Sequence, residues 1–231
     1  MRTTPTALAA LALLLSASVG QAADCKADPA PGIDWQECNK SRLMLSDSQL
    51  EGANLSGADL SYTDLRQSNL AGAHFEKATL IRSSLAGSRA DKANFSRIEG
   101  YRTVFAKVSA QEASFASAEL QRADFTEANL TGADFQKAEL GRADFTDAVI
   151  TGSRFPMANL SRVQLNKAKV EGPIDLSGAF LFLTRVEGLD LSQAVGLEQW
   201  QIDEACGDAA TKLPANLKVP SGWPCTAGEA D

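Results

Sequence analysis

The sequence predicts a repeat fold, and two periodic features carry that prediction. From position 45 to position 170 an apolar residue recurs every five residues, and 23 of these 26 central positions hold Leu, Phe, Ile or Val. Two residues before the centre, Ala, Ser or Thr occupies 22 of the 26 positions. An amphipathic helix repeats every 3.6 residues and a half-buried strand every two, so neither explains a period of five. The bias toward Ala, Leu and Phe, with few Trp and Tyr, also indicates a repeat.

Four segments carry a resemblance to a known family: 53–57 (Ala-Asn-Leu-Ser-Gly), 58–62 (Ala-Asp-Leu-Ser-Tyr), 123–127 (Ala-Asp-Phe-Thr-Glu) and 128–132 (Ala-Asn-Leu-Thr-Gly). They resemble the pentapeptide-repeat family. The resemblance implies an all-β fold, a right-handed quadrilateral β-helix in which four pentapeptides form one square coil. It also implies that the central residue and the small residue two before it point inward. A narrow interior admits a large side chain only beside a small one, which explains the alanines.

The repeat frame runs from residue 33 to residue 172, shifts by one residue at Pro173 and resumes over 174–193. The resulting 32 units predict about eight coils of twenty residues. Where the central residue shrinks to Gly100 or Ala110, we expect the larger neighbours Ile98 and Val108 to conserve volume. Residues twenty apart should stack, and one interior column then contains five consecutive phenylalanines: Phe75, Phe95, Phe115, Phe135 and Phe155.

Residues 1–23 have the features of a secretory signal peptide. Arg2 lies in a short charged start, an apolar run covers 7–15, and small residues fill 16–23. We predict cleavage after Ala22 or Ala23 and a periplasmic or secreted protein. The alternative is a lipoprotein anchored at Cys25, although Asp24 precedes it where a small residue is expected. No later apolar run is long enough to span a bilayer.

The four cysteines lie near the two ends of the mature chain, Cys25 and Cys38 at one end and Cys206 and Cys225 at the other. An oxidising compartment permits disulfides. Of the three pairings that four cysteines allow, the local one needs no contact between the two ends. Spacings of thirteen and nineteen residues do not resemble a CxxC zinc site. We expect two structural disulfides, Cys25 with Cys38 and Cys206 with Cys225.

The chain is predicted to have four parts: a signal peptide (1–23), an N-terminal cap with a first, incomplete coil (24–40), the β-helix (41–193) and a C-terminal cap (194–231). Open β-helix ends would invite end-to-end assembly, so we expect both to be covered. Lys40 occupies a nominally inward position in the first coil. In the C-terminal cap, 197–205 has helical composition and Gly207 suits a helix end. The candidate plugs are Trp200, Ile202 and Trp223.

The formal net charge of −7 is unevenly distributed. Residues 41–172 contain 16 basic and 16 acidic side chains, whereas 174–231 contain nine acidic and three basic ones. The acidic balance argues against a nucleic-acid binder that holds phosphates. Some members of the resembled family act on DNA gyrase by presenting a DNA-like acidic rod. That alternative function, a DNA-mimicking regulator of a topoisomerase, is disfavoured here by the neutral rod and the signal peptide.

One outward column consists of arginines at an interval of twenty residues, and these are the candidate partner-binding residues: Arg82, Arg102, Arg122, Arg142 and Arg162. Like charges stacked about 5 Å apart repel one another. The nearby carboxylates that could relieve this repulsion are Glu99, Glu119, Glu139, Asp124 and Asp144. The column is therefore either a solvated salt-bridge ladder or a strip that grips an anionic partner.

The sequence contains no phosphate-binding loop, nucleophile elbow or histidine ligand cluster, and its single histidine, His74, lies at an outward position. We expect no catalytic residue, no cofactor and no metal. The predicted function is an exported structural or interaction scaffold that binds an unknown protein or an anionic envelope component. An enzyme that uses surface carboxylates is the second alternative.

Overall fold

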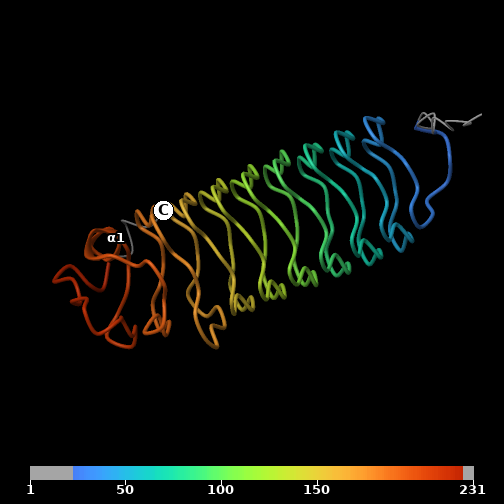
Figure 1. Ribbon diagram of the computed structural model, residues 1–231. Coiled ribbons are helices and arrows are strands. Elements are labelled where there is room, and N and C mark those ends of the chain that lie inside the picture. Colours follow the sequence, from blue (N-terminus) through green and yellow to red (C-terminus); the bar gives the residue numbers. More distant parts are fainter. Residues whose placement is uncertain (1–22, 226–231) are drawn as a thin grey trace, which may run out of the picture.

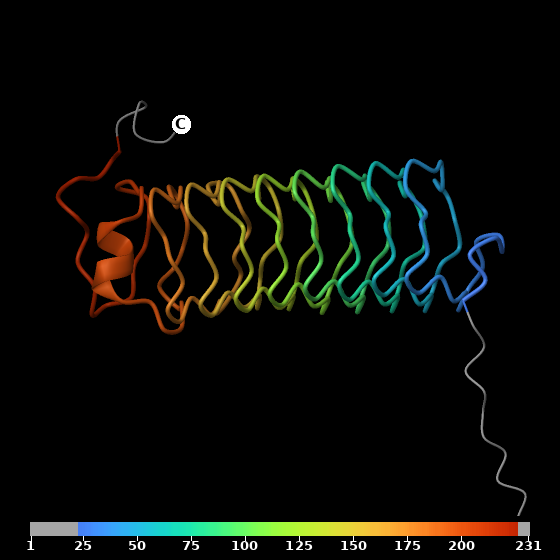
Figure 2. The ribbon, with the colours of Figure 1, turned by 90° about the horizontal axis from the view of Figure 1, so that it is seen from above.

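Each five-residue unit forms a short extended segment followed by a turn, and four units complete one coil. The computed structural model describes residues 23–225, whose coils stack along one axis into a rod (Figures 1 and 2). Within these residues, helix is confined to α1, Gln199–Asp203, near the C-terminal end. The β-structure consists of parallel single-residue bridges between coils. The fold is the right-handed quadrilateral β-helix that the resemblance implies.

Residues twenty apart in the sequence lie side by side in adjacent coils. Asn54, for example, forms a parallel bridge with His74. The Leu55 N–H donates to the His74 carbonyl at 2.7 Å, and the His74 N–H donates to the Ala53 carbonyl at 2.9 Å. Because each segment pairs with the coil before it and the coil after it, the backbone polar groups along the rod are satisfied.

A turn with one left-handed residue closes each unit. In the unit centred on Leu55, the Ala58 N–H donates to the Leu55 carbonyl at 3.1 Å, and Gly57 has a φ of 66°. This left-handed position recurs two residues after each centre, so that its side chains form four columns along the corners of the rod. Glycine adopts the conformation freely, whereas an L-residue in it costs about 1–2 kcal/mol. Even so, 22 non-glycine residues in the described region have a positive φ.

Two columns of phenylalanine rings fill the interior. In the predicted column, from Phe75 to Phe155, neighbouring ring centroids are 4.7–5.0 Å apart. The rings of the second column are 4.8–4.9 Å apart and meet those of the first edge-on. All eight rings are fully buried, and the second column consists of Phe105, Phe125 and Phe145. Offset stacking within a column and edge-on contact between columns are both favourable aromatic geometries.

Two irregularities in the repeat have the expected structural consequences. Ile98 is fully buried beside Gly100, and a Cβ on Gly100 would lie only 2.8 Å from Leu120 Cδ2. The interior volume is therefore filled from neighbouring positions. Across Pro173 the bridge interval becomes 21 residues, as in the pair Arg154 and Asp175, so the coils stay paired on both sides of the extra residue except at Lys169, which bridges only to the preceding coil.

The N-terminal end of the interior is closed by a buried cation. Lys40 is only 6% exposed, and its Nζ lies 3.6 Å from the centre of the Trp35 ring. Burial lowers the pKa of Lys40, while the carboxylates of Asp24 and Asp28 act in the opposite direction. The inward lysine thus covers the first coil through a cation–π contact.

The C-terminal cap satisfies the open edge of the last coils. The side chain of Gln201, in α1, is fully buried and donates to the carbonyls of Leu176 at 2.8 Å and Ala179 at 2.9 Å. Farther along the chain, the backbones of Lys212 and Asp190 form a parallel β-bridge. The two side chains also form an ion pair, with the Lys212 Nζ 2.8 Å from the Asp190 carboxylate. The hydrogen bond from Lys212 is the main reason that the pKa of Asp190 is lowered to about 2.

The predicted plugs of this cap behave differently from one another. Ile202 is fully buried, as expected. The prediction for Trp200 is wrong, because its side chain is 46% exposed and its indole N–H donates to the Glu198 carboxylate at 2.8 Å. In a helix of five residues, the face that carries Gln201 and Ile202 turns inward, and Trp200 consequently points to solvent.

Gly207 has a packing role rather than the predicted role of a helix end. The helix already ends at Asp203. A Cβ on Gly207 would lie 2.3 Å from the Trp223 ring, so only glycine allows this ring to approach the backbone. The Trp223 indole N–H donates to the Ala205 carbonyl at 2.7 Å and holds the ring in place.

Each end of the rod contains one disulfide. The pairs are Cys25–Cys38 and Cys206–Cys225, the local pairing among the three that the sequence allows. Apart from Ala23, the predicted signal peptide lies outside the described residues, and the four predicted parts of the chain stay a prediction. Across residues 23–225, helices long and apolar enough for a membrane span are absent.

Candidate interaction surface

One corner of the rod carries arginine at nearly every coil. We call it the arginine corner; its residues are Arg42, Tyr62, Arg82, Arg102, Arg122, Arg142 and Arg162. All seven have φ values between 55° and 62°, the left-handed conformation of the corner turns. Because their backbones stack coil by coil, neighbouring arginines are separated by the coil spacing, about 4.8 Å.

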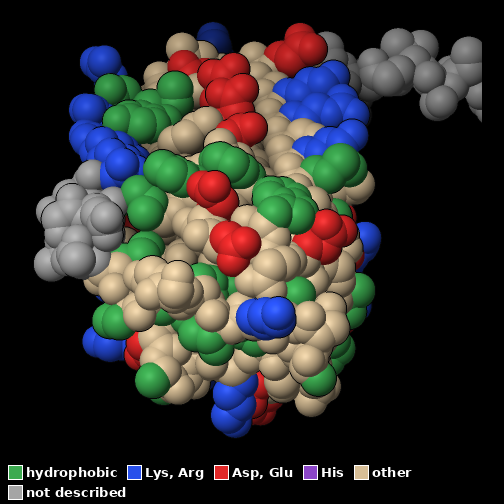
Figure 3. All heavy atoms as spheres, turned by 90° about the vertical axis from the view of Figure 1, so that its left-hand side faces the viewer, with side chains coloured by type: hydrophobic (Ala, Val, Ile, Leu, Met, Phe, Trp, Pro, Cys, Tyr) green, Lys and Arg blue, Asp and Glu red, His purple; other side chains and the backbone are tan. Residues whose placement is uncertain are grey.

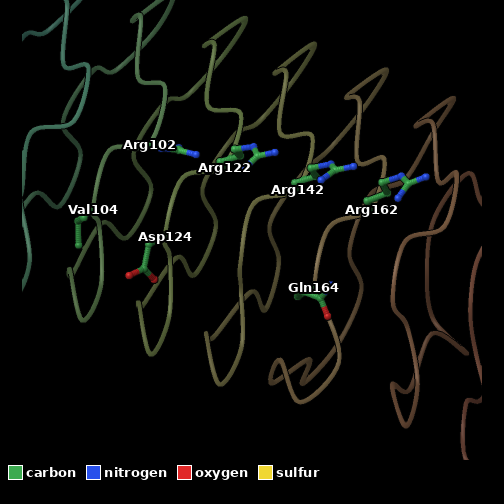
Figure 4. Close-up of a pocket in the computed structure, with 7 residues that line it drawn as sticks. All are labelled: Arg102, Val104, Arg122, Asp124, Arg142, Arg162 and Gln164. Carbon is green, nitrogen blue, oxygen red and sulfur yellow. The ribbon is translucent and has the colours of Figure 1, made fainter. Parts of the chain in front are cut away.

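Four of these arginines line a groove of about 480 Å³ beside the corner. Figure 4 shows the four side chains in a row, all extending in the same direction, toward the C-terminal end of the rod. The other side of the groove comes from the next face, which contributes Val104, Asp124 and Gln164. The arginines of the groove are Arg102, Arg122, Arg142 and Arg162. A linear array of guanidinium groups can form bidentate contacts with several carboxylates or phosphates in succession.

From Arg82 to Arg142, the structure does not contain the predicted salt-bridge ladder to the neighbouring carboxylates. No ion pair among residues 23–225 involves Arg82, Arg102, Arg122 or Arg142. Three of the five nearby carboxylates have other partners: that of Asp124 accepts hydrogen bonds from Thr126, that of Asp144 from Thr146, and that of Glu139 from Asn159.

At two of the other corners, opposite charges in adjacent coils form ion pairs. Lys92 lies 3.7 Å from Glu112, and Lys107 lies 3.4 Å from Glu127, each pair joining the same corner of adjacent coils. At the arginine corner the equivalent neighbours carry the same sign. Viewed onto the C-terminal end, the upper part of the surface has a group of acidic side chains between two groups of basic ones (Figure 3).

Aromatic rings provide part of the compensation near the start of the corner. The guanidinium carbon of Arg42 lies 5.7 Å from the Tyr62 ring centre, and that of Arg82 lies 6.0 Å from the same ring. Arg102 lies 5.3 Å from the ring of Tyr101. These contacts are weak at exposed sites. Among the described residues, Arg122 and Arg142 make no such ring contact.

A second hollow, which the sequence did not reveal, continues the arginine corner toward the C-terminal end. The Arg162 N–H donates to the Phe182 carbonyl at 2.8 Å, and the Leu183 N–H donates to the Glu204 carbonyl at 2.7 Å. In the next two coils, this corner is therefore occupied first by Phe182 and Leu183 and then by Glu204. We call the hollow at this end the terminal pocket; it measures about 550 Å³, and its side chains include Phe182, Leu183, Asp203, Glu204 and Trp223.

The terminal pocket combines exposed aromatic surface with acidic groups. Phe180 is 45% exposed and Phe182 39% exposed, and their rings are stacked with centroids 6.2 Å apart. Neither Asp203 nor Glu204 takes part in the ion pairs found among the described residues. These two rings do not belong to the interior phenylalanine columns, because they occupy outward positions of the frame that resumes after Pro173.

The described part of the chain contains no group of three or more His, Cys, Asp or Glu side chains that could hold a metal ion. His74, the single histidine, takes part in the backbone pairing between coils at an outward position. The prediction that the protein has no catalytic residue and no cofactor stays a prediction.

Comparisons with known proteins agree with the architecture. The model of the family described as pentapeptide repeats matches eight copies, which together span more than half of the chain, at 32–61, 58–97, 111–147 and 143–172. No curated protein sequence matches the chain.

Three similar solved structures are themselves pentapeptide-repeat or resistance proteins. HetL, involved in heterocyst differentiation regulation in the cyanobacterium Nostoc sp. strain PCC 7120, is 21% identical, with 84% of this chain and 87% of HetL covered and a TM-score of 0.39. QnrB1, a plasmid-mediated fluoroquinolone resistance protein, is 15% identical, with 83% and 95% covered and a TM-score of 0.37. A thylakoid-lumen protein of Arabidopsis thaliana is 24% identical, with 52% and 67% covered and a TM-score of 0.22.

These similarities are too low to carry an argument about function. The assignment rests instead on the matched repeats, on the coils of twenty residues and on the buried phenylalanine columns. On this evidence the chain belongs to the pentapeptide-repeat family.

Proposed function

We propose that this protein is an exported, non-catalytic scaffold that binds an anionic partner through its arginine corner. The observation that carries the proposal is the groove in which Arg102, Arg122, Arg142 and Arg162 extend side by side. At two other corners, oppositely charged neighbours form ion pairs, Lys92 with Glu112 and Lys107 with Glu127. At the arginine corner the positive charges accumulate, which favours an external negative partner over internal pairing.

The backbone gives a second, independent reason for this proposal. The arginines adopt positive φ values that disfavour any side chain. Glycine would relieve that conformational cost and occupies this position in other coils, such as Gly132 and Gly152, but it is absent from the arginine corner. Bidentate contacts with the carboxylates of a protein or with an anionic envelope component would offset that cost.

The two disulfides support an oxidising compartment as the place of action. Disulfides persist in exported proteins and are rare in the cytosol. Here they join Cys25 to Cys38 and Cys206 to Cys225, so each closes a cap against the coils. Together with the predicted signal peptide, they favour a periplasmic or secreted protein.

The two alternative functions have less support. A DNA-mimicking regulator of a topoisomerase would need an acidic rod, whereas 41–172 contain equal numbers of basic and acidic side chains. The likeness to QnrB1, at 15% identity, concerns the fold alone and brings no resistance activity to this chain. A carboxylate-based enzyme would need acidic groups tuned by burial, and the candidate carboxylates along the rod lie at outward positions.

The proposal is tested by measuring how tightly the oxidised mature protein binds a fluorescein-labelled octapeptide of glutamate. The test variant replaces Arg102, Arg122 and Arg142 by glutamine. We expect fluorescence anisotropy to show at least about tenfold weaker binding by this variant, because each exposed ion pair contributes up to about 1 kcal/mol. Binding by the wild type should also weaken between about 0.01 M and about 1 M salt, as the Debye length falls from about 30 Å to about 3 Å.

A matched control variant replaces Lys77, Arg97 and Lys137 by glutamine. These residues occupy the same left-handed corner position on a neighbouring corner, so the change in net charge and in backbone conformation is equal. The control should bind like the wild type. Equal losses in the two variants would mean that binding depends on net charge alone and would refute the assignment to the arginine corner.

A further inference from the structure

We infer that the terminal pocket is a second subsite of the arginine groove, and that the two together recognise an extended polypeptide with an acidic stretch at one end and an apolar and a basic residue at the other. This inference rests on the proposed function for the groove and adds the chemical class of its partner. It does not follow from the repeat pattern, because the pocket is built partly from the cap.

Continuity along one corner of the rod is the first argument. Backbone hydrogen bonds connect Arg162 to Phe182 at 2.8 Å and Leu183 to Glu204 at 2.7 Å, so the terminal pocket begins one coil beyond the last arginine. From Arg102 to Glu204 the corner rises by five coils, about 24 Å. An extended polypeptide of about seven or eight residues covers that distance at about 3.3 Å per residue.

The reversal of chemistry along this path is the second argument. The groove presents four guanidinium groups and one carboxylate, that of Asp124, whereas the terminal pocket presents the carboxylates of Asp203 and Glu204 beside the rings of Phe182 and Trp223. The carboxylate of Glu204 is exposed and takes no part in an ion pair among the described residues. Such a pocket fits an apolar side chain followed by an ammonium or guanidinium group.

This combination selects one class of anionic partner. A phosphate polymer or an acidic polysaccharide carries one sign of charge along its whole length, so it would meet like charge at Asp203 and Glu204. A polypeptide can change from acidic to basic within a few residues. In an extended segment, alternate side chains point to the same side about 6.6 Å apart, so about three carboxylates match the four arginines of the groove.

The test uses labelled octapeptides with the same composition, six glutamates, one phenylalanine and one lysine, and the oxidised mature protein. In one peptide Phe-Lys follows the glutamates, in the second Lys-Phe precedes them, and in the control the pair lies in the middle. We expect one of the two end-placed orders to bind at least about tenfold more tightly than the control. Equal affinity of all three peptides, or tighter binding of the control, would overturn the inference.

Two single substitutions assign the effect to the terminal pocket. Glu204→Gln and Phe182→Ala should each reduce the advantage of the preferred order by at least about threefold. Circular dichroism confirms that each variant is folded. The Glu204→Lys variant should bind octaglutamate more tightly than the mixed peptide with the preferred order. A preferred order that survives all three substitutions would overturn the inference.

The two proposals fail in different ways. If Arg102, Arg122 and Arg142 can be replaced by glutamine without loss of octaglutamate binding, the function proposed for the groove is wrong. If that loss occurs but the order of the mixed peptide has no effect, only the terminal pocket is wrong. Inorganic polyphosphate serves as the single-sign probe, and tighter binding of polyphosphate than of every peptide would identify a phosphate polymer as the partner and overturn the inference.

Discussion

Two opposite corners of the rod have the same backbone and very different side chains. At the arginine corner, five successive coils from Arg82 to Arg162 carry arginine. The diagonally opposite corner, which we call the glycine corner, consists of Gly52, Gly72, Lys92, Glu112, Gly132 and Gly152. All of these residues have φ values between 55° and 69°. The β-helix therefore imposes one conformation at both corners and leaves the choice of residue to other demands.

The residues at the two corners differ because different factors determine them. Glycine takes the left-handed conformation without strain, so the glycine corner follows the preference of the backbone. Where it departs from glycine, Lys92 and Glu112 are opposite charges 3.7 Å apart. The arginine corner departs from glycine at every coil and pairs its charges with no neighbouring carboxylate from Arg82 to Arg142. The function proposed for its side chains is to bind a partner, whereas the buried phenylalanine columns fill the interior.

The largest expected effect separates the interior from both corners. Phe115→Ala should lower the free energy of unfolding by about 3–5 kcal/mol, because it leaves a cavity that the repeating backbone cannot collapse. The Phe115 ring is stacked 4.9 Å from that of Phe95 and 4.7 Å from that of Phe135. Arg122→Ala should cost less than about 1 kcal/mol. Urea unfolding measures both, and equal losses would contradict the division between interior and corner.

An intermediate effect compares the two corners directly. Gly132→Arg should destabilise the protein by about 1 kcal/mol, since Gly132 has a φ of 69° and a Cβ there meets only Glu112 Cγ at an ordinary 3.6 Å. Arg122→Gly should leave the free energy of unfolding unchanged or raise it slightly, because relief of strain opposes the entropy of the unfolded chain. Urea unfolding in which Arg122→Gly proves as destabilising as Gly132→Arg would show that the arginines hold the coil together.

The smallest effect concerns the C-terminal cap, beyond both corners. The pKa of Asp190 is about 2 in the folded protein, below its ordinary value of 3.8, because of hydrogen bonds from Lys212 and Ser192. A lowered carboxyl pKa contributes stability above about pH 4, and this contribution is lost as the pH falls toward 2. The destabilisation caused by Asp190→Asn, measured by urea unfolding, should therefore shrink between pH 5 and pH 2. A difference that stayed constant with pH would contradict this.

The interior and the coil length could be predicted from the sequence because both follow from one short period. In a period of five with a small residue two positions before each centre, only one assignment of side chains to the interior and the surface is possible. The extra residue at Pro173 changes the register by one. The second phenylalanine column, Phe105 to Phe145, follows from the same rule at an interval of twenty. The edge-on contact between the rings of the two columns could not be predicted from the spacing.

The caps could be predicted only in outline, because no repeat constrains them. The sequence indicated a helix and apolar plugs, but the exposure of Trp200 depends on how one short helix is rotated. The buried Gln201 also belongs to this cap, where its side chain donates to two carbonyls of the last coils. Such a role has no signal in composition or spacing.

The candidate surface was predicted in part. The arginine column is visible at its interval of twenty, and the structure places four of its members in one groove. Whether neighbouring carboxylates pair with them depends on local hydrogen bonds, such as those that Asp124 accepts from Thr126. The terminal pocket brings Phe182 beside Trp223, forty-one residues later, and such proximity emerges only when the cap is folded.

The central claim is that the arginines accept an unfavourable conformation because their side chains bind a partner. The most direct measurement is the affinity of the oxidised protein for octaglutamate when Arg102, Arg122 and Arg142 are replaced together by glycine. This variant removes the guanidinium groups and relaxes the backbone at the same time. We predict that binding weakens at least about tenfold while the free energy of unfolding does not fall. Unchanged affinity in a stably folded variant would contradict the account.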